Sequence, residues 1–461
     1  MTSTVQQAPV QRPAAPVTCA GTRQTRTRPG VVSLLIGIGA LATVALWWQN
    51  TPSINGLGDW LTNAGRVTGL LAGYTMVVLV ALMARIPSVE RGVGADRLAR
   101  WHAMGGRYAV SLVVAHALAI TWGYSVTAHT NVLAQTRTLL TSYPDVLAAT
   151  VAGLLLVGVG VTSARAARRK LAYETWYYLH FYTYLAVALA FSHQLATGAD
   201  FIANPPARWA WGAMYASVAA AIAWCRFVTP VRQGLRHQLR VVSVHAEAAG
   251  VVSVVVEGRA LSELQAQPGQ FFRWRFLSRD LWWVSGPYSL SAPVRNNRMR
   301  ITVKALGGHS AAVARLRPGT RVLTEGPYGA MTADLRTRRK VLLLAGGVGI
   351  TPLRALFETI PGHGRDVTLL YRSSRPSEVV FADELEAIAA HRGADLHIVT
   401  GSRAALGGDP LSSTALKARI PDLAHHEVFI CGPDGMTGAA VSALREAGVP
   451  RRRIHHESFD F

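Results

Sequence analysis

Four histidines lie inside two long apolar stretches of this 461-residue chain. His102 and His116 are 14 residues apart in the first stretch, and His180 and His193 are 13 residues apart in the second. Ionisable side chains in membrane-length apolar segments are costly and therefore usually functional. A helix rises about 1.5 Å per residue, so each stretch places one imidazole toward either face of a bilayer.

This arrangement of imidazoles favours iron chemistry. The two stretches are the third and fifth of six apolar segments, so they run in the same direction and bring His102 level with His180, and His116 level with His193. Two axial nitrogens at each level are what two stacked b-type haems need. The alternative is four polar histidines hydrogen-bonded within a bundle, and the matched levels disfavour it. A di-metal site is also disfavoured, because the levels are far apart and lack carboxylates.

The helical spacing of the second pair is less regular than that of the first. At about 100° per residue, 14 residues return to within about 40° of the same face, whereas 13 residues end about 140° away. We therefore expect a bend or bulge between His180 and His193, or side chains that reach around the helix.

The elements that position these histidines are segments of about 20 apolar residues, the length that crosses a bilayer. No A-x-A cleavage pattern follows the first segment, and Trp47-Trp48 at its end is typical of an interfacial anchor. The sequence predicts a six-helix transmembrane bundle over residues 31–228. Its spans are Val31–Trp48, Val67–Ala84, Trp101–Tyr124, Val146–Thr162, Tyr173–Leu195 and Trp209–Val228.

The formal net charge of +21 is explained by basic residues that flank the spans on one side. The positive-inside rule places the N-terminus and everything after residue 230 in the cytoplasm of a multi-pass protein of the cell membrane. No aromatic-interleaved basic module occurs, so the predicted partner is the lipid bilayer and not nucleic acid. Residues 1–30 are predicted to be a mobile cytoplasmic tail. The flanking residues are Arg23, Arg26, Arg28, Arg85, Arg91, Arg97, Arg100, Arg165, Arg168, Arg169, Lys170, Arg226, Arg232, Arg236 and Arg240.

Composition excludes several classes of protein. Charged residues make up 16% of the chain and hydrophobic residues 50%, whereas soluble chains carry about 25% charged residues. An ordinary cytosolic enzyme along the whole length and a disordered chain are both excluded. The cysteines Cys19, Cys225 and Cys431 are too few and too dispersed for a four-cysteine iron–sulfur or zinc site.

After the spans the pattern changes to strands. Residues 237–336 alternate apolar and polar residues between turn signals, which predicts an antiparallel β-barrel. Residues 337–461 alternate strand and helix, which predicts a Rossmann-like parallel α/β domain. The predicted strands are Leu239–Val242, Val251–Val256, Phe271–Phe276, Met299–Lys304, Arg321–Glu325, Val341–Leu344, Val367–Tyr371, Leu396–Val399 and Val428–Cys431.

Two motifs in the barrel segment suit a flavin. In Pro287-Tyr288-Ser289, the ring can pack on an isoalloxazine and the hydroxyl can bond its N5 or O4 edge. A glycine turn that opens a helix suits a pyrophosphate, because backbone N–H groups point outward there. The alternative to the second motif is a plain turn with a serine N-cap. Its residues are Lys304, Gly307, Gly308 and Ser310.

A stronger motif, Ala345–Pro352, follows the strand Val341–Leu344 and opens a helix. Its glycines let the backbone approach a phosphate-bearing ligand, and its threonine can cap the helix. The motif is not the G-x-G-x-x-G fingerprint, and a structural strand-to-helix turn is the alternative. Its candidate binding residues are Gly346, Gly347, Gly349, Thr351 and Pro352.

Three further positions complete the candidate nicotinamide site. Arg372, Ser373 and Arg375 suit a ribose 2′-phosphate, which favours NADPH over NADH, although a solvated loop is the alternative. Cys431-Gly432-Pro433 ends the last predicted strand, where the thiol lies near a nicotinamide or is simply an inert core residue. The terminal Phe461 can cover a flavin ring until nicotinamide displaces it, or it is a frayed end.

Together these elements resemble the NADPH oxidase and ferric reductase superfamily. Residues 237–461 resemble ferredoxin–NADP reductases, through Ala345–Pro352, Cys431–Met436 and Glu457–Phe461. Residues 31–228 resemble the ferric reductase transmembrane domain, through the histidine spacings of 14 and 13. The resemblance implies a haem domain over 31–228, an FAD-binding domain over 237–336 and an NADPH-binding domain over 337–461.

The resemblance also implies roles for these residues. The four histidines bind two b-type haems, and Ser289, Cys431 and Phe461 lie at the reacting centre. Electrons pass from NADPH through FAD and the haems to an extracytoplasmic acceptor, a ferric chelate or dioxygen. Two positions depart from the family pattern: Gly286 stands where a basic residue precedes the flavin motif, and Ile120 stands where superoxide-forming oxidases carry a further histidine.

Two alternative functions remain open from the sequence. The chain is a haem subunit that supplies electrons to a periplasmic redox partner, or it is a haem-dependent membrane sensor or channel regulated by its flavin domain. The nicotinamide motif and the terminal aromatic favour the enzyme.

Overall fold

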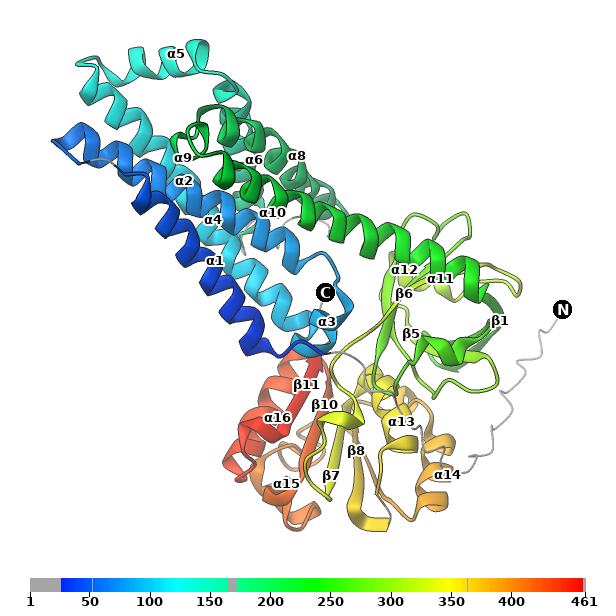
Figure 1. Ribbon diagram of the computed structural model, residues 1–461. Coiled ribbons are helices and arrows are strands. Elements are labelled where there is room, and N and C mark those ends of the chain that lie inside the picture. The colour runs from blue at the N-terminus through cyan, green and yellow to red at the C-terminus, as the bar shows by residue number, and fades with distance from the viewer. Residues whose placement is uncertain (1–25, 52, 165–170, 172, 363, 459–461) are drawn as a thin grey trace. The chain divides into compact units, whose positions relative to one another are not determined.

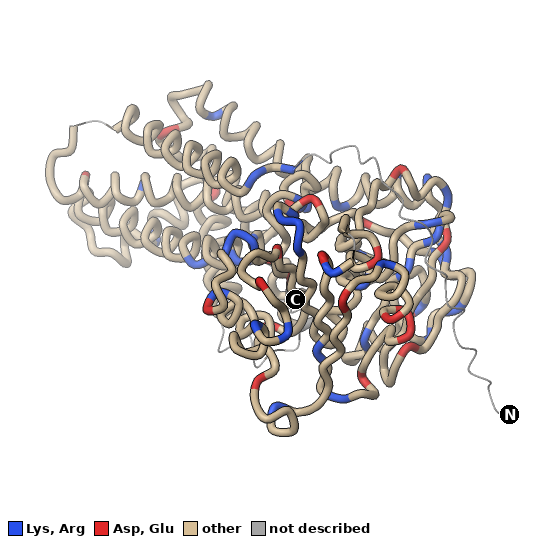
Figure 2. The backbone as a smooth tube through the Cα atoms, turned by 90° about the horizontal axis from the view of Figure 1, so that it is seen from below, with Lys and Arg blue, Asp and Glu red and all other residues tan. Residues whose placement is uncertain are grey.

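The computed structural model describes residues 26–51, 53–164, 171, 173–362 and 364–458 (Figure 1). The chain divides into two compact units. Among the described residues, the helical unit comprises Thr27–Ile86 and Arg97–Cys225. The sheet unit comprises Arg26, Pro87–Asp96 and the chain from Arg226 onward. Figure 2 shows charged residues thinly scattered along the helical unit and dense in the sheet unit.

Six long helices make up most of the described part of the helical unit. Five helices are long and apolar enough to cross a membrane, counting the continuous helix Pro205–His237 as one. The helix Tyr173–Thr197 is long enough but is not among the five, because tyrosines and histidines lower its hydropathy. A sixth crossing therefore stays a prediction. The long helices are α1 (Pro29–Gln49), α2 (Leu57–Leu82), α4 (Ala95–Thr127), α6 (Val146–Ser163), α8 (Tyr173–Thr197) and α10 (Pro205–Ala223).

The core of the bundle is made of small and flexible apolar residues on α2, α4, α6 and α8. Alanines let the helix backbones approach closely, which drives association where lipid replaces water. The core residues are Ala72, Met76, Leu79, Ala109, Ala152, Leu156 and Ala186. Two short helices, α5 (Val132–Ser142) and α9 (Ala199–Ile202), complete the unit.

The first half of the sheet unit, β1 to β6, forms two antiparallel three-stranded sheets around one core that includes Phe272, Trp274 and Phe276. Isolated bridges at Arg240–Arg321 and Leu290–Ile301 join the sheets. In the described residues no continuous ladder joins them, so closure into the predicted barrel is not confirmed. The sheets are β1 (Arg240–Ala248), β2 (Val251–Glu257) and β5 (Arg298–Lys304), and β4 (Gly286–Ser289), β3 (Phe271–Phe276) and β6 (Val322–Tyr328).

The second half of the sheet unit is a parallel five-stranded sheet in the order β11-β10-β7-β8-β9. Of the three inner strands, β7 and β10 are buried throughout and β8 is buried except at Arg372, as expected for strands covered on both faces. The strands are β7 (Val341–Gly346), β8 (Val367–Ser373), β9 (Asp395–Thr400), β10 (Glu427–Gly432) and β11 (Ile454–Ser458). The helices are α13 (Ile350–Thr359), α14 (Ala382–Arg392), α15 (Ser413–Arg419) and α16 (Asp434–Glu446).

The predicted mobile tail over residues 1–30 is wrong at its end. Helix α1 begins at Pro29, a residue preorganised for a first helical position. Arg26 donates hydrogen bonds to Thr332 Oγ1 at 2.7 Å and to Asp334 Oδ2 at 3.0 Å, within the sheet unit. Residues 1–25 lie outside the described part of the chain.

Candidate functional site

Helices α4 and α8 bring the four histidines together in two facing pairs. The ring centroids of His102 and His180 are 5.8 Å apart with planes at 68°, and those of His116 and His193 are 6.3 Å apart at 59°. These are the two pairs that the sequence placed at matched levels. The structure therefore has the arrangement of imidazoles that the spacing predicts.

Hydrogen bonds fix the protonation of three of the four rings. His102 Nδ1 donates to the carbonyl of Leu79 at 3.1 Å, and His116 Nδ1 donates to that of Gly65 at 2.7 Å. A carbonyl only accepts, so both rings carry their proton on Nδ1 and keep a lone pair on Nε2. This is how metal-binding histidines are usually oriented.

Thr197 does the same for His193 with a side chain. Its hydroxyl donates to the carbonyl of His193 at 2.9 Å and lies 2.9 Å from His193 Nδ1. Because the hydroxyl proton is used on the carbonyl, its oxygen accepts from Nδ1–H. The Nε2 atom of His193 is again left with its lone pair.

His180 differs from the other three. Its Nδ1 is buried and has no hydrogen-bond partner among the described residues. Its ring stacks instead on Trp176, with centroids 5.2 Å apart and planes at 27°. Trp176 Nε1 donates to Ser163 Oγ at 3.2 Å, so the indole is held by the end of α6.

Threonines offer a local reason why histidines 13 residues apart can both face α4. Thr183 Oγ1 donates to the carbonyl of His180 at 2.7 Å, as Thr197 does to that of His193. Such back-bonding often bends helices. On α2, Gly69 leaves room for the outer pair, since a Cβ atom there would collide with the ring of His116.

Two buried polar clusters hold the helices around the outer pair. Trp211 Nε1 donates to Gln194 Oε1 at 2.7 Å, which ties α8 to α10 at the residue after His193. Arg66 NH2 donates to Asp200 Oδ1 at 2.7 Å, which ties α2 to α9 at the residue after Gly65. Buried charges in such a bundle are expected to be paired.

The two pairs fit haem better than a bare metal ion. Among the described residues, no group of three or more His, Cys, Asp or Glu side chains could hold a metal. Two imidazoles suffice only for a metal that brings its other ligands, as porphyrin iron does. A metal–imidazole bond is about 2 Å, so a metal held between two facing imidazoles would need about 4 Å between their nitrogens. Ring centroids 5.8 and 6.3 Å apart leave that room.

In the sheet unit, the candidate nicotinamide site lies at the carboxyl ends of β7 and β10. The chain leaves β7 toward β8 and β9 on one side and returns to β10 and β11 on the other, so the β7–β10 edge is the topological switch point. Ligands of open α/β sheets bind there. A Cβ atom on Gly349 would strike the carbonyl of Cys431, and one on Gly432 would lie 3.2 Å from the Cα of Gly346. The predicted motifs Ala345–Pro352 and Cys431–Pro433 therefore contact each other through backbone atoms at their glycines.

Burial raises the pKa of both the thiol and the carboxyl group at this edge. Burial, with further contributions from Glu457 and Asp96, raises the pKa of the Cys431 thiol well above its ordinary value. Burial and Asp96 raise the pKa of Glu457 to about 7, against hydrogen bonds from the backbone N–H groups of Ala330 and Met331. Cys431 pairs with Glu457 in the β10–β11 ladder.

Of the remaining residues of the nucleotide motif, Thr351 and Pro352 stabilise the start of α13, and Gly347 leaves open space. Thr351 Oγ1 donates to the carbonyl of Val348 at 3.0 Å, and Thr351 and Pro352 are buried in the first turn of α13. Gly347 has a φ of 53°, a left-handed conformation that favours glycine, with open space at its Cβ position.

The three residues predicted to contact a ribose 2′-phosphate have different roles in the structure. Arg372 donates to the carbonyls of Ser373, Val399 and Gly401, so its guanidinium fastens β8 to β9. Ser373 is buried and donates to the carbonyl of Arg375 at 3.1 Å. The side chain of Arg375 is 77% exposed, with Glu378 4.0 Å away. Of the three predicted residues, Arg375 is the one that presents its charge outward.

The flavin motif lies on β4, with Ser289 buried and Tyr288 half-buried. Tyr288 Oη lies 3.2 Å from His309 Nδ1, and the two rings are 6.4 Å apart with planes at 14°. The two rings are therefore nearly parallel and are linked by this polar contact. Burial raises the pKa of Tyr288 to about 12 and lowers that of His309, so both rings are neutral. A neutral aromatic pair fits an isoalloxazine.

The departure at Gly286 has a packing reason. A Cβ atom there would lie 2.9 Å from the ring of Tyr288, so the tyrosine occupies the space of a side chain. Pro287 pairs with Arg273 of β3, which places a guanidinium beside the motif on the neighbouring strand.

The glycine turn is open toward solvent. Gly307 and Gly308 have φ values of 113° and 45° and nothing within 4 Å of their Cβ positions. Ser310 Oγ accepts from the N–H of Leu306 and donates to the carbonyl of Gly307, both at 2.9 Å, which closes the turn. Lys304 ends β5 and is exposed. The turn fits a phosphate-bearing group.

Several residues of the site escape sequence reasoning. Leu79 and Gly65 contribute only carbonyls, which every residue has, so no signal could have found them. His309 could have been found from the sequence, because it lies between Gly308 and Ser310 of the predicted glycine turn. Phe461 lies outside the described residues, which end at Ser458.

Comparison with known proteins is consistent with this division. A ferric reductase-like transmembrane component matches residues 68–191, and an oxidoreductase NAD-binding domain matches residues 343–442. The ferredoxin reductase component of 3-ketosteroid-9-alpha-monooxygenase from Mycolicibacterium smegmatis is 34% identical over 48% of this chain and 63% of its own length. The chain thus spans just under two thirds of that relative.

Two further relatives are similar to this chain. Ferredoxin–NADP reductase B from Sorangium cellulosum is 32% identical over 38% of this chain and 79% of its own length. The FAD/NAD-binding domain of a nitric oxide dioxygenase from Vibrio cholerae is 24% identical over 48% of this chain and 98% of its own, with a TM-score of 0.40.

Proposed function

We propose that this chain is a transmembrane electron-transfer enzyme, because it belongs to the ferric reductase and NADPH oxidase superfamily. It joins a ferric reductase-like transmembrane component to a ferredoxin–NADP reductase-type module. It takes electrons from cytoplasmic NADPH and delivers them through FAD and two b-type haems to an extracytoplasmic acceptor. The proposed acceptor is a small molecule, a ferric chelate or dioxygen. The observation that carries the proposal is the two facing histidine pairs on α4 and α8.

The cofactors supply the redox chemistry: NADPH gives a hydride, FAD accepts two electrons and releases them singly, and haem iron changes oxidation state. The chain supplies the ligands and their orientation. His102 and His180 would hold one haem and His116 and His193 the other, each through Nε2. Carbonyls of Leu79 and Gly65 and the hydroxyl of Thr197 keep three of these rings in the required tautomer.

At the nucleotide edge, the chain provides close backbone approach beside a neutral thiol. Gly347 leaves open space at the switch point, whereas Gly346, Gly349 and Gly432 let the loop, the end of β10 and Met436 pack closely on one another. Cys431 stays a neutral thiol because burial raises its pKa. We infer that Arg375 contacts the 2′-phosphate of NADPH, because it is the exposed arginine of its loop.

The experiment that tests this function is an anaerobic titration of the full chain in detergent with NADPH, followed by visible spectroscopy. Reduced b-type haem bands with two haems per chain would support the whole path. A folded preparation without haem would overturn the central assignment. His180→Ala and His116→Ala should each remove one haem, whereas His129→Ala, an exposed histidine in the helical unit, should keep both.

The terminal acceptor is tested in the same preparation. Rapid reoxidation of the haems by ferric chelate or by dioxygen identifies a small-molecule acceptor. Haems that reduce fully but reoxidise slowly with both would favour a periplasmic protein partner. Ion currents that persist in His180→Ala without any electron transfer would favour the sensor or channel.

A further inference from the structure

Helix α11 (Thr229–His237) packs with the wrong side outward for an ordinary surface helix. Its inner side holds Pro230 and His237, both buried, and Gln233, whose Nε2 donates to the carbonyl of Gly326 at 2.9 Å. Its outer side exposes Val231 and Leu235. Surface helices normally bury their apolar stripe against the core, so this helix presents apolar side chains to something else.

The apolar row continues into the preceding turn. Phe227, Val231 and Leu235 follow one another at intervals of four residues, which places them on one face of a helix. Their exposed fractions are 67%, 54% and 73%. The residues between Trp224 and Val228 form a π-helical turn that joins α10 to α11 without a break.

A second exposed apolar group lies on the loop between β3 and β4. Trp282 and Trp283 are 59% and 47% exposed. The loop is held firmly: Leu281 is fully buried, and the N–H of Trp282 donates to the carbonyl of Ser278 at 3.0 Å. Two tryptophans are therefore displayed on a fixed support.

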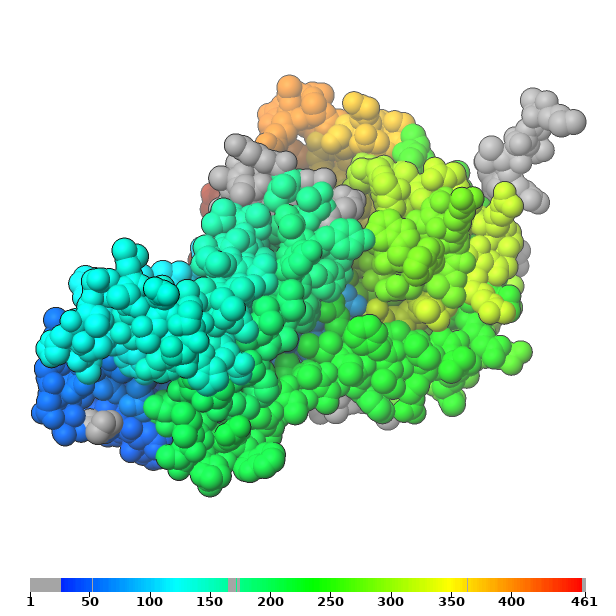
Figure 3. All heavy atoms as spheres, turned by 90° about the horizontal axis from the view of Figure 1, so that it is seen from above, coloured from blue at the N-terminus to red at the C-terminus, as the bar shows by residue number. Residues whose placement is uncertain are grey.

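The loop and α11 share one side of the β3–β6 sheet. A Cβ atom on Gly234 of α11 would collide with Leu323, and Leu323 pairs with Arg275 across the ladder. Cross-strand partners point to the same face, and Arg275 NH1 donates to the carbonyl of Trp282 at 3.2 Å. In Figure 3, the green atoms of α11 border yellow-green atoms of this half on the exposed face.

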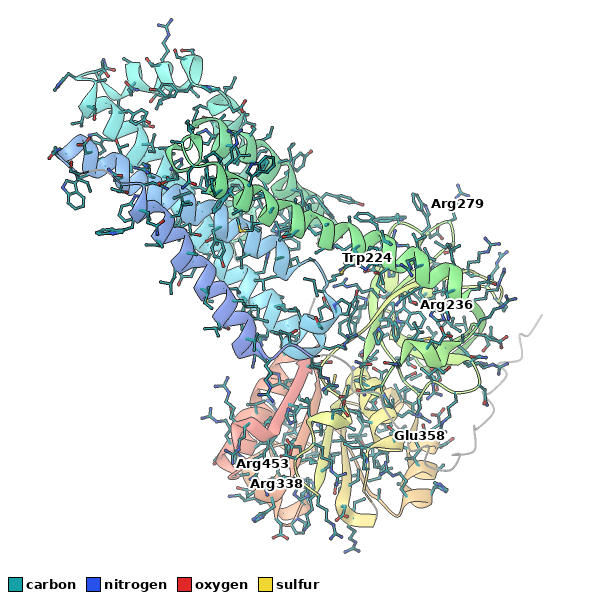
Figure 4. All side chains as sticks on the ribbon, in the orientation of Figure 1. Trp224, Arg236, Arg279, Arg338, Glu358 and Arg453 are labelled. Carbon is teal, nitrogen blue, oxygen red and sulfur yellow. The ribbon has the colours of Figure 1, made fainter. Side chains whose placement is uncertain are left out.

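Arginines lie close in the chain to the exposed apolar residues. Arg236 on α11 and Arg279 on the loop are labelled in Figure 4. Arg226 and Arg232 lie on the same continuous helix. Asp280 is adjacent to Arg279 in the chain, and Glu263 is ion-paired with Arg236 at 2.5 Å. Basic residues beside Trp, Phe and Leu are typical of segments that lie in the interface of an anionic membrane.

Helix length places α11 at that interface. The continuous helix Pro205–His237 has 33 residues, which is about 50 Å at 1.5 Å per residue. A bilayer with its headgroup layers is about 40–45 Å thick. A helix that starts at one surface therefore reaches the other surface within α11.

We propose that Phe227, Val231, Leu235, Trp282 and Trp283 form a membrane-surface patch that inserts into the anionic cytoplasmic leaflet. The patch holds the flavin half of the sheet unit against the bilayer. Trp283 stands three residues before Gly286, the first residue of β4, so lipid contact fixes the approach to the flavin strand. The inference depends on the membrane-spanning helix and not on the proposed electron transfer.

The test uses the full chain in nanodiscs, with Cys19→Ser and one nitroxide label at a time. The buried Cys225 and Cys431 are left in place. Labels are attached to Trp283→Cys and Leu235→Cys, and to Leu406→Cys as a matched exposed apolar control in the parallel-sheet half. Power-saturation EPR compares collisions with membrane-dissolved oxygen and with a water-soluble nickel chelate.

In nanodiscs with phosphatidylglycerol, the oxygen-to-nickel accessibility ratio at positions 235 and 283 should exceed that at position 406 severalfold. The excess should fall in discs of phosphatidylcholine alone. Equal ratios at all three positions would overturn the proposal. Labels at 235 and 283 shielded from both reagents would also overturn it, because a protein segment and not lipid would then cover the patch. No arm depends on enzyme activity, so failure here is distinguishable from failure of the proposed function.

Discussion

The helical unit fixes the positions of its histidines, and the sheet unit fixes its two halves relative to each other. The two units use different interactions to do so. In the helical unit, the histidines are held by backbone carbonyls and one hydroxyl. In the sheet unit, a network of five charged side chains joins β5 of the two-sheet half to α13 and α14 of the parallel-sheet half. The helical unit does contain the buried pair Arg66–Asp200, but the histidines themselves are held by uncharged groups, because charges are costly in a membrane-embedded bundle.

The network centres on Glu384, which accepts from Arg300 at 2.7 and 2.8 Å and from Arg354 at 2.9 Å. Glu358, labelled in Figure 4, accepts from Arg354 and pairs with Arg295 at 2.7 Å. Arg300 also donates to the carbonyl of Ser291 at 3.1 Å, two residues after the flavin motif. Burial opposes ionisation of Glu384, but its two arginines outweigh burial and lower its pKa. The network therefore fixes the flavin strand relative to the helix that follows the nucleotide loop.

The largest expected effect belongs to the histidines. His116→Ala should reduce the haem content from two per chain to one, since a single axial imidazole leaves the iron weakly held. Pyridine haemochrome analysis of the purified protein measures this directly. A variant that retained two haems would break the comparison, because the outer pair would then not be a ligand pair.

The next effect is expected in the charge network. Glu384→Gln should lower the unfolding free energy of the sheet unit by about 3 kcal/mol, the low end for breaking a buried pair, because a fifth of the Glu384 side chain is exposed. It should also slow flavin reduction by NADPH. Glu257→Gln is the matched control, since the Glu257–Arg298 pair is about half exposed and is worth at most about 1 kcal/mol.

Denaturant titration and stopped-flow flavin bleaching measure the two effects. If both variants unfolded at the same denaturant concentration, the sheet unit would not depend on buried charge pairs. The contrast with the helical unit would then disappear.

A pH dependence should distinguish the sheet unit further. The pKa of Glu457 is about 7 in the folded chain and 4.5 ordinarily, so the folded state binds more protons between these values. Stability should therefore fall as pH rises from about 4.5 to about 7 and stay lower above, by roughly 3 kcal/mol. Glu457→Gln should remove this component, so the difference between the two unfolding profiles isolates it. Parallel profiles from pH 4 to 9 would contradict the assignment.

The smallest effect sharpens the comparison within the helical unit. Thr197→Val removes the acceptor for His193 Nδ1–H, and such outer contacts typically change metal affinity about 10–100-fold. Thr150→Val is the control, because the exposed Thr150 makes the same kind of bond to a backbone carbonyl, that of Val146, on α6, which carries none of the four histidines. Haem-transfer kinetics to an apoglobin acceptor measure both. Equal loss rates in the two variants would mean that the ring contact contributes nothing.

Much of the fold follows from periodicity in the sequence. The predicted span Val146–Thr162 is α6 to within one residue, and Phe271–Phe276 is β3 without change. The strands β4 and β11 were not predicted, because each is short and its residues carry no alternation of their own. Their pairing comes from neighbours already in place, β3 for β4 and β10 for β11.

The sequence by itself determined which histidines face each other and which glycines open the nucleotide turn. Both depend on local spacing, and spacing is preserved when a segment becomes a helix or a strand. Only the tertiary structure decided what holds them. The carbonyls of Leu79 and Gly65 come from another helix, and Glu384 meets Arg300 across 84 residues. Every residue has a carbonyl, and the chain has 47 basic and 26 acidic residues, so no pattern marks these partners before the chain has folded.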